Sequence, residues 1–206
     1  GQGYIQTNPL QLCLMTAQLA NGGYKIYPRI TINKDHESAE AIKKKMLQAK
    51  DEIKERKDTL FNVTTDFLKK KSQYKSLVRN PENIKFVLDA MFRSTNEVYG
   101  TSYGSRIDDP KYQFAGKTGT SQVKRITDEE RELDLETYQI PYKERDHAWF
   151  VAFGPYKEPR YALSVLVEHG GSGSKAAAPI AKKLLKLIID RHELREKTTK
   201  QKGVKV

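Results

Sequence analysis

The chain has 206 residues, of which 37% are hydrophobic, enough for one domain or a large part of one with a buried core. Lysine and arginine outnumber aspartate and glutamate by 37 to 26, a net charge of +11, but the excess lies in lysine runs without interleaved aromatic residues, which argues against a nucleic-acid partner. The only cysteine excludes a disulfide scaffold, and no apolar segment approaches the length of a membrane span.

The first segments predict a helix followed by an edge strand. Residues 9–20 are largely apolar, Pro9 suits a first helical turn, and the sequence Asn21-Gly22-Gly23 ends the helix. Cys13 lies in this helix and is predicted to fill the core. Residues 24–32 alternate enough to predict a short strand, and Pro28 places that strand at a sheet edge.

The next part of the chain is charged. Residues 33–80 lack glycine, and their apolar residues recur at loosely helical spacing, which predicts a charged helical excursion. A second helix is predicted after Pro81, where apolar residues recur at spacings of three and four: Ile84, Val87, Leu88, Met91 and Phe92. Residues 100–110 are predicted to be a loop.

Three strands and a final helix are predicted in the second half. Residues 112–123 fit a strand, an acidic irregular segment follows at 127–145, and the apolar runs at 148–153 and 161–167 form a hairpin around Gly154-Pro155. Residues 170–174 read as a flexible loop. The helix at 176–189 is predicted to bury Leu184, Leu185, Leu187, Ile188 and Ile189, and the tail beyond His192 to be polar and frayed.

The strand at 112–123 carries the tetrad Lys117-Thr118-Gly119-Thr120. A fixed cation can hold a substrate carboxylate, neighbouring hydroxyls can donate to it, and a glycine lets another backbone lie close. This pattern indicates serine acyl transfer on peptide carboxylates. A polar hairpin would have the same residues, so the tetrad alone leaves both interpretations open.

An acyl-transfer site also needs a nucleophile, and Ser-x-x-Lys occurs at Ser72, Ser121 and Ser172, where about one match is expected by chance. Ser72 precedes a Ser94-Thr95-Asn96 string in the expected order. However, Ser72 follows a lysine run, whereas the lysine base of such a serine must be desolvated in a buried helix. We interpret the other two strings as incidental.

Other reactive groups show no usable pattern. The four histidines are far apart and lack metal-ligand spacing, so no metal and no cofactor are expected. Glu168 and His169 are interpreted as adjacent strand residues that point to opposite faces, which rules out an acid/base pair. The glycine-rich stretch at 170–173 lacks the lysine of a phosphate-binding loop.

Several motifs occur in one order along the chain. They are Gly1-Gln2-Gly3-Tyr4, Thr7-Asn8-Pro9-Leu10-Gln11-Leu12, Ala20-Asn21-Gly22-Gly23, Gly100-Thr101, Gly116 with the tetrad, His147-Ala148-Trp149-Phe150-Val151-Ala152-Phe153, and Val167-Glu168-His169-Gly170-Gly171-Ser172-Gly173-Ser174 with Ala176-Ala177-Ala178-Pro179-Ile180-Ala181. Together they resemble the C-terminal part of the penicillin-binding protein transpeptidase domain. The last of them is similar to the class B enzymes that serve elongation of rod-shaped bacteria.

The resemblance implies an α/β fold of the serine transpeptidase and β-lactamase type, an antiparallel sheet with helices on its faces. Residues 1–206 would be the C-terminal part of that domain, and residues 33–80 look like an insertion. The implied activity is D,D-transpeptidation, which cross-links peptidoglycan stem peptides through a serine acyl-enzyme. Lys117 and Thr120 would be catalytic, the latter through its backbone N–H as an oxyanion donor, while Thr118 and Gly119 would bind substrate.

The family's serine lies upstream of the Gly-Gln-Gly segment, so we expect the nucleophile and the membrane anchor to lie outside this chain, and the chain alone to be inactive. The expected partners are stem peptides ending in D-Ala-D-Ala, β-lactams and, through the parent protein, a glycosyltransferase and elongation-complex proteins at the periplasmic face of the inner membrane. The alternatives are a serine β-lactamase or D,D-carboxypeptidase fragment, or a basic non-enzymatic module that binds an anionic polymer through residues 43–75.

Overall fold

The computed structural model describes residues 6–28, 76–124, 127, 132–133 and 135–201. Three strands, β1 (Ala115–Ser121), β2 (His147–Gly154) and β3 (Tyr161–Val167), form an antiparallel sheet in the order β1-β2-β3. The helices are α1 (Pro9–Ala20), α4 (Pro81–Asn96) and α6 (Ala178–Gln201), with short turns η1 (Tyr103–Ser105), η2 (Tyr142–Glu144) and η3 (Gly173–Ala177). The predicted α/β class with an antiparallel sheet is confirmed.

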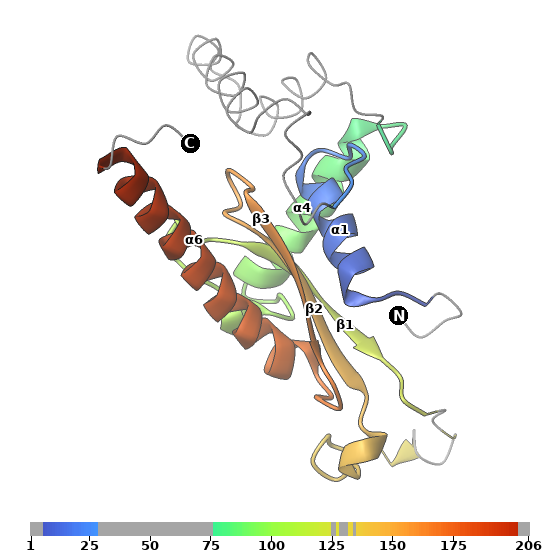
Figure 1. Ribbon diagram of the computed structural model, residues 1–206. Coiled ribbons are helices and arrows are strands. Elements are labelled where there is room, and N and C mark those ends of the chain that lie inside the picture. Colours follow the sequence, from blue (N-terminus) through green and yellow to red (C-terminus); the bar gives the residue numbers. More distant parts are fainter. Residues whose placement is uncertain (1–5, 29–75, 125–126, 128–131, 134, 202–206) are drawn as a thin grey trace.

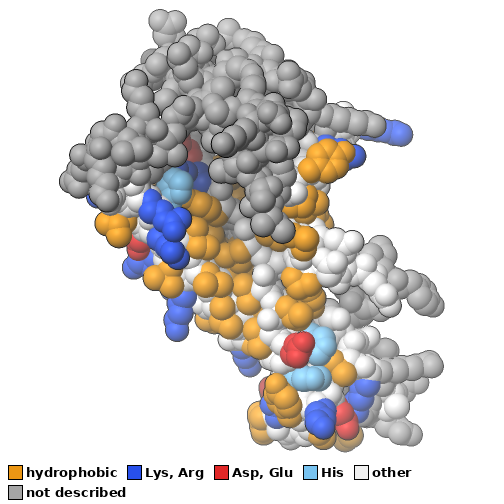
Figure 2. Space-filling model, viewed as in Figure 1, with side chains coloured by type: hydrophobic (Ala, Val, Ile, Leu, Met, Phe, Trp, Pro, Cys, Tyr) orange, Lys and Arg blue, Asp and Glu red, His pale blue; other side chains and the backbone are white. Residues whose placement is uncertain are grey.

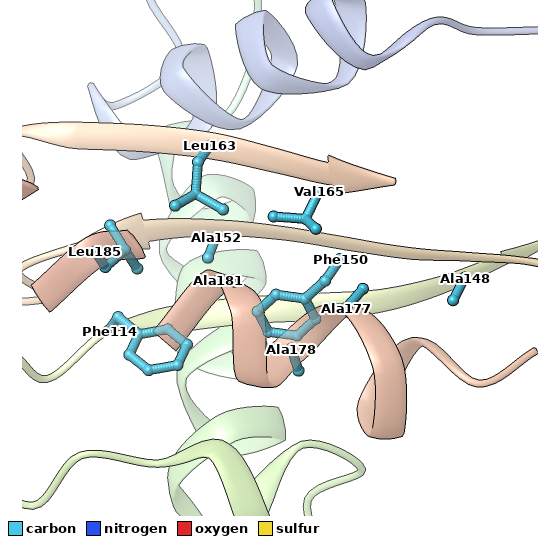
Figure 3. Packing of buried hydrophobic residues seen from close by; sticks show 10 residues of the cluster. All are labelled: Phe114, Ala148, Phe150, Ala152, Leu163, Val165, Ala177, Ala178, Ala181 and Leu185. Atoms are coloured by element: carbon cyan, nitrogen blue, oxygen red, sulfur yellow. The ribbon is translucent and has the colours of Figure 1, made fainter. Parts of the chain in front are cut away.

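Helices cover both faces of the sheet (Figure 1). Alternation along β2 divides its side chains between two cores, because successive strand residues point to opposite faces. Phe150 belongs to the core under α6, whereas Phe153 belongs to the core under α1 and α4. Figure 3 shows Phe114 and Phe150 pointing towards α6, whose alanines at 178 and 181 let the helix approach closely.

The two N-terminal helices begin at side-chain caps, as their sequences favour. The Asn8 side chain accepts a hydrogen bond from the Gln11 N–H at 2.9 Å, and the Gln11 side chain accepts one from the Asn8 N–H at 3.0 Å. The Asn80 side chain caps α4 with a single hydrogen bond, which it accepts from the Glu82 N–H at 2.9 Å. The predicted helices at 9–20 and after Pro81 are therefore confirmed; α1 packs on β3 and α4 on β1.

The predicted hairpin is also confirmed, as β2 and β3, but β1 is shorter than the predicted 112–123. The Tyr112 N–H bonds back to the Asp109 carbonyl, and the Gln113 carbonyl accepts from the Tyr156 N–H at 2.7 Å. These two residues are therefore engaged in turn and loop contacts, and the strand begins at Ala115.

The prediction of a strand at 24–32 is wrong for residues 24–28, the part of this range that the structure describes. Tyr24 forms one isolated bridge with Ser76, and residues 25–28 form no strand. The Asn21 side chain bonds to both the N–H and the carbonyl of Tyr24, which keeps the chain turned after α1. The predicted helical excursion at 33–80 lies outside the described residues except for 76–80, which are not helical.

The C-terminal predictions need three corrections. The loop predicted at 170–174 ends at Ser172, where the π-helical turn η3 begins, and α6 continues to Gln201 rather than fraying after His192. Leu185 and Ile189 are buried as predicted, but Leu184, Leu187 and Ile188 are 41%, 64% and 37% exposed. Ala178 and Ala181 of α6, with Ala177 of η3, form the rest of the buried face, and Figure 2 shows a band of exposed hydrophobic side chains that runs along α6.

Glu168 and His169 lie in a turn after β3 rather than in a strand, because His169 has a φ of +55°. Cys13 is half-buried against β3, where its Sγ lies 3.4 Å from the Ala162 carbonyl oxygen, and burial raises the pKa of this thiol. In the described part of the chain, no helix is both long and apolar enough to cross a membrane.

Candidate functional site

The tetrad at 117–120 lies in β1, at an edge of the described sheet (Figure 1). Within the described residues, β1 pairs only with β2, where Lys117 is opposite Val151 and Thr120 is opposite Ala148. The outer side of this strand is therefore open to a further extended chain. Burial along β1 changes at Lys117: Ala115 and Gly116 are buried, and the residues after them are not.

Strand alternation separates the tetrad side chains. Lys117 and Gly119 share the face of β1 towards α4, whereas Thr118 and Thr120 share the face towards α6. The lysine nevertheless reaches its neighbour, because Nζ donates to the Thr118 carbonyl oxygen at 2.8 Å and lies 3.3 Å from Thr118 Oγ1. A cation and a hydroxyl thus meet at the exposed edge of the sheet.

A cavity of about 630 Å³ opens beside the two threonines. Thr118 and Thr120 form one wall, and Ser172 and Ser174 face them from the segment after β3. The remaining lining comes mainly from the segment that precedes β2, together with Thr101: Lys124, Leu135, Thr137, Ile140, Pro141, Glu144, Arg145, Asp146, Gly171 and Gly173.

The charged residues of this cavity hold its walls together. Lys124 Nζ pairs with Glu144 at 2.6 Å, and Arg145 Nε donates to the Ile140 carbonyl at 2.8 Å. Asp146 accepts a hydrogen bond from the Val123 N–H at 3.3 Å. The bonds of Val123 and Lys124 join the chain after β1 to the segment before β2, and the Arg145 bond lies within that segment. The hydroxyls of the cavity remain as groups suited to orient a ligand.

Gly173 brings η3 against the tetrad strand. A Cβ at this position would lie 2.5 Å from the Trp149 carbonyl oxygen, 2.9 Å from that of Gly119 and 3.2 Å from Thr118 Cβ. Only glycine fits such an approach without a backbone shift. On β1 itself, a Cβ at Gly119 would meet Trp149 Cβ at 3.2 Å, so this glycine also accommodates the neighbouring strand.

A second cavity, of about 640 Å³, lies on the Lys117 side of β1. Its lining is mostly apolar and comes from α1 and α4, including Met15, Leu19 and Val87, and it also contains Val151. Thr101 lines both cavities, which places it between the lysine side and the threonine side of the strand. Several of the apolar side chains here are exposed, among them Phe86 at 75%.

The Ser-x-x-Lys strings do not form nucleophile and base pairs where they are described. The ammonium of Lys124 pairs with Glu144 rather than Ser121. Ser172 Oγ lies 3.0 Å from Ser174 Oγ and caps η3 through the Lys175 N–H, while the Lys175 side chain is exposed. The string at 72–75 lies outside the described residues.

The Ser94-Thr95-Asn96 string forms the end of α4 and has structural contacts. Asn96 Nδ2 donates to the Phe92 and Phe114 carbonyls, both at 2.9 Å, which fixes the chain that leads into β1. Ser94 Oγ lies 3.2 Å from Thr101 Oγ1. Among the described residues, no cluster of three or more His, Cys, Asp and Glu side chains could hold a metal ion.

The sequence interpretation missed the residues that complete the threonine-side cavity. Ser172 and Ser174 were assigned to a loop, Thr101 was noted only as part of the Gly100-Thr101 motif, and Thr137 and Arg145 were given no role in a site. The glycine-serine pattern at 170–174 was the one local signal, because glycines permit the close approach that brings these serines to β1. The other residues come from separate segments that only the fold brings together.

Comparisons with known proteins show which family the chain resembles. The penicillin binding protein transpeptidase domain matches residues 1–186. The peptidoglycan D,D-transpeptidase MrdA of Salmonella typhimurium is 30% identical over 190 residues, which are 92% of this chain and 26% of that protein. MrdA of Acinetobacter baumannii is 29% identical over 184 residues, 87% of this chain and 22% of that protein.

Solved structures agree with these matches. Pseudomonas aeruginosa PBP2 in complex with WCK 5153 is 30% identical with a TM-score of 0.56, and the match covers 90% of this chain and 31% of that one. Helicobacter pylori PBP2 in its complex with MreC has a TM-score of 0.61 at 24% identity, over 92% of this chain and 26% of that one, which supports the fold. The chain thus spans about a quarter of the length of the curated relatives that it matches.

Proposed function

This chain belongs to the penicillin-binding protein transpeptidase domain family, and we propose that it is the C-terminal, substrate-holding part of a peptidoglycan D,D-transpeptidase. The observation that carries this proposal is the tetrad at 117–120 on an open sheet edge. This strand carries the Lys117 ammonium on one face and the Thr118 and Thr120 hydroxyls on the other. Within the described residues, the outer edge of its backbone is unpaired. The relatives named peptidoglycan D,D-transpeptidase favour this activity over a β-lactamase or a D,D-carboxypeptidase.

In this proposal Lys117 and Thr118 hold the terminal carboxylate of the donor peptide. The Lys117 ammonium already lies 3.3 Å from Thr118 Oγ1, so a carboxylate oxygen can take one hydrogen bond from each group. Hydrogen bonds from a cation to a carboxylate are about twice as strong as neutral ones. The Thr120 hydroxyl, which lines the cavity on the same face as Thr118, supplies a further contact.

The peptide backbone would pair with β1 as an added strand, because the outer hydrogen-bonding groups of an edge strand are available to an extended chain. Gly119 presents no side chain to obstruct it. The Thr120 N–H is proposed as one donor to the oxyanion that forms at the attacked carbonyl, and donors of this kind act mainly in the transition state.

The nucleophile in this scheme is a serine outside residues 1–206. Its Oγ attacks the carbonyl of the penultimate D-Ala, the C–N bond to the terminal D-Ala breaks, and that D-Ala leaves with the proton as a free amino acid. An amine of a second stem peptide then attacks the ester, releases the serine and forms the cross-link. A β-lactam imitates the donor: its ring opens on the serine.

The apolar cavity on the Lys117 side is where we place the segment that carries this serine. Its exposed walls on α1 and α4 need a covering element, and Lys117 is part of its lining. A segment bound in this cavity would bring its serine close to the Lys117 ammonium. Lys117 would then sustain proton transfer to and from the serine.

We also propose the setting in which the parent protein acts. It would work at the periplasmic face of the inner membrane through an anchor outside this chain, with a glycosyltransferase and elongation-complex proteins. The complex of the Helicobacter pylori relative with MreC supports partners of this kind. The alternative of a basic module binding an anionic polymer rests on residues 43–75, which lie outside the described residues.

Acylation kinetics of the full-length protein with a fluorescent penicillin test this function. We expect Lys117→Ala to slow acylation by about 10²- to 10³-fold, because a group that stabilises the developing charge is lost. Lys175→Ala is the matched control: this exposed lysine of the neighbouring Ser-x-x-Lys string should leave the rate near that of the unmodified protein. Equal rates for the two variants would contradict the proposal.

A further inference from the structure

Two histidines form a contact beside the threonine-side cavity that the proposed chemistry does not use. His147 begins β2, and His169 lies in the turn after β3. Their ring centroids are 4.8 Å apart, and the Tyr142 ring lies 5.1 Å from the His169 ring. Figure 2 shows histidine side chains, in pale blue, next to one another on the surface at the lower end of the molecule.

The hydrogen bonds assign a proton to each ring. The backbone N–H of His169 donates to His147 Nδ1 at 2.9 Å, so this nitrogen carries no proton and the neutral ring has its proton on Nε2. His169 Nδ1 lies 3.0 Å from the Arg145 carbonyl oxygen, which can only accept, so His169 carries its proton on Nδ1.

Protonation therefore affects the two rings differently. An imidazolium carries protons on both nitrogens, so a charged His147 cannot accept the His169 N–H. His169 would take its second proton on Nε2, and its bond to Arg145 would remain. Protonation therefore breaks the hydrogen bond that His147 accepts, but it leaves the hydrogen bond that His169 donates.

The hydrogen bond to His147 stabilises an unfavourable backbone conformation at His169. His169 has a φ of +55°, a left-handed conformation that is unfavourable for residues with a side chain. The next residues are closely fitted, since a Cβ on Gly170 would lie 3.0 Å from Ala148 Cβ, and the Gly171 N–H donates to the Asp146 carbonyl at 2.8 Å. This turn thus determines how the serines at 172 and 174 reach the cavity.

We propose that His147 is a positioning residue: while neutral it holds residues 169–174 as a wall of the threonine-side cavity, and when protonated at Nδ1 it releases that wall. The site would then be ordered at neutral pH and loosened in acid. The cavity's role in holding substrate rests on the proposed function. The hydrogen bond from the His169 N–H to His147, called the latch below, is a property of the folded chain.

Other charged and titratable groups surround the pair, and the test must separate them from His147. They come from the turn after β3, from the segment around η2 and from the end of β1: Glu168, His169, Tyr142, Glu144, Arg145, Asp146 and Lys124. The Arg145 guanidinium lies 5.9 Å from the centre of the Tyr142 ring, which itself contacts His169. A second positive charge on His147 would add repulsion to the loss of the hydrogen bond.

Two NMR measurements on the 206-residue chain test the latch. Long-range ¹H–¹⁵N spectra of the rings should show a bare Nδ1 on His147 and a protonated Nδ1 on His169 above about pH 7.5. Amide exchange of His169, corrected for the intrinsic effect of pH, should become about five- to tenfold faster towards pH 5.5, the size expected for one lost hydrogen bond. Amide shifts of residues 170–174 should move with the same midpoint.

Three variants assign the effect. His147→Asn can place an amide oxygen where Nδ1 lies and does not titrate, so the His169 amide should stay protected at both ends of the range. His147→Leu removes the acceptor and should exchange fast at every pH. His192→Asn, which changes a histidine on α6, should behave like the unmodified chain.

A protonated Nδ1 on His147 at high pH, or an unchanged pH dependence in His147→Asn, would overturn the proposal, and the second result would assign the titration to another group. If His147→Leu does not fold, the comparison with His147→Asn still decides. Neither readout involves acylation, so the failure of Lys117→Ala to slow acylation would refute the proposed function and leave the latch standing.

Discussion

β1 and β2 are neighbours in one sheet, but their side chains have different surroundings. β2 is buried along most of its length, and Phe150, Ala152 and Phe153 are completely inaccessible. β1 is buried at Ala115 and Gly116 and becomes accessible from Lys117 onwards. Core packing therefore explains the residues of β2, whereas packing within the described chain does not explain a lysine and two threonines on β1.

The difference indicates where a substitution should act. A change in β2 removes contacts that hold helices to both faces of the sheet, so its main cost is stability. A change in the tetrad removes few contacts within the chain, so its main cost is expected in what binds at the sheet edge. The predictions below test this contrast, from the largest expected effect to the smallest.

The largest effect on stability is expected from Phe150→Ala. This side chain is fully buried between the sheet and α6 and contacts Phe114 edge-on at a centroid distance of 6.4 Å. Its truncation should lower the free energy of unfolding by about 3–5 kcal/mol in urea titrations. Phe86→Ala is the control, because Phe86 is 75% exposed and should change the same quantity by less than about 0.5 kcal/mol. Similar costs for the two would contradict the assigned cores.

A smaller cost is expected from Gly173→Ala, which tests the contact between η3 and β1. The added methyl would lie 2.5 Å from one backbone oxygen and 2.9 Å from another, so η3 must move away from the tetrad at a cost of about 1–3 kcal/mol. Gly104→Ala is the matched control, since nothing lies within 4 Å of its added Cβ. If Gly173→Ala is as stable as the control, the approach of η3 to β1 is not as close as described.

The smallest effect is expected where the chain entering β1 is tied to α6. The Tyr112 hydroxyl donates to Asp190, and this bond, with Lys111 beside it, lowers the pKa of the Asp190 carboxyl. A depressed pKa means that the stabilisation is complete above the ordinary carboxyl value of about 3.9 and is lost as the pH falls through the lower, folded-state value.

Asp190→Asn should therefore lower Tm slightly at pH 7, and the difference from the unmodified chain should shrink towards pH 2.5. The carboxylate is exposed to solvent, which keeps the effect small. Thermal melts at the two pH values measure it. A difference that grows in acid would have the wrong sign for this account.

The sequence predicted the parts of the fold that depend on local patterns. Apolar spacing with a capping residue located α1 and α4, and two apolar runs around a Gly-Pro turn located β2 and β3. The same signals failed where a distant contact decides. Tyr112 and Gln113 are held in turn and loop contacts, including a hydrogen bond from Tyr156, so the strand does not extend before Ala115. Helix α6 buries alanines beside Leu185, while Leu184 and Leu187 stay exposed.

The candidate site was predictable only in part for the same reason. The tetrad is contiguous, so its residues and its strand could be read directly. The cavity beside it joins residues near 101, 118, 145 and 172, which no local pattern connects. The left-handed turn at His169 was also missed, because its support comes from His147, 22 positions away.

The central claim is that the tetrad forms one wall of an acyl-transfer site whose nucleophile lies outside this chain. Intact-mass spectrometry after incubation with penicillin tests it most directly, in parallel on the 206-residue chain and the full-length protein. We expect no adduct on the isolated chain, and one stoichiometric adduct on the full-length protein at a serine outside residues 1–206. A stoichiometric adduct on Ser72, Ser121 or Ser172 would contradict the account.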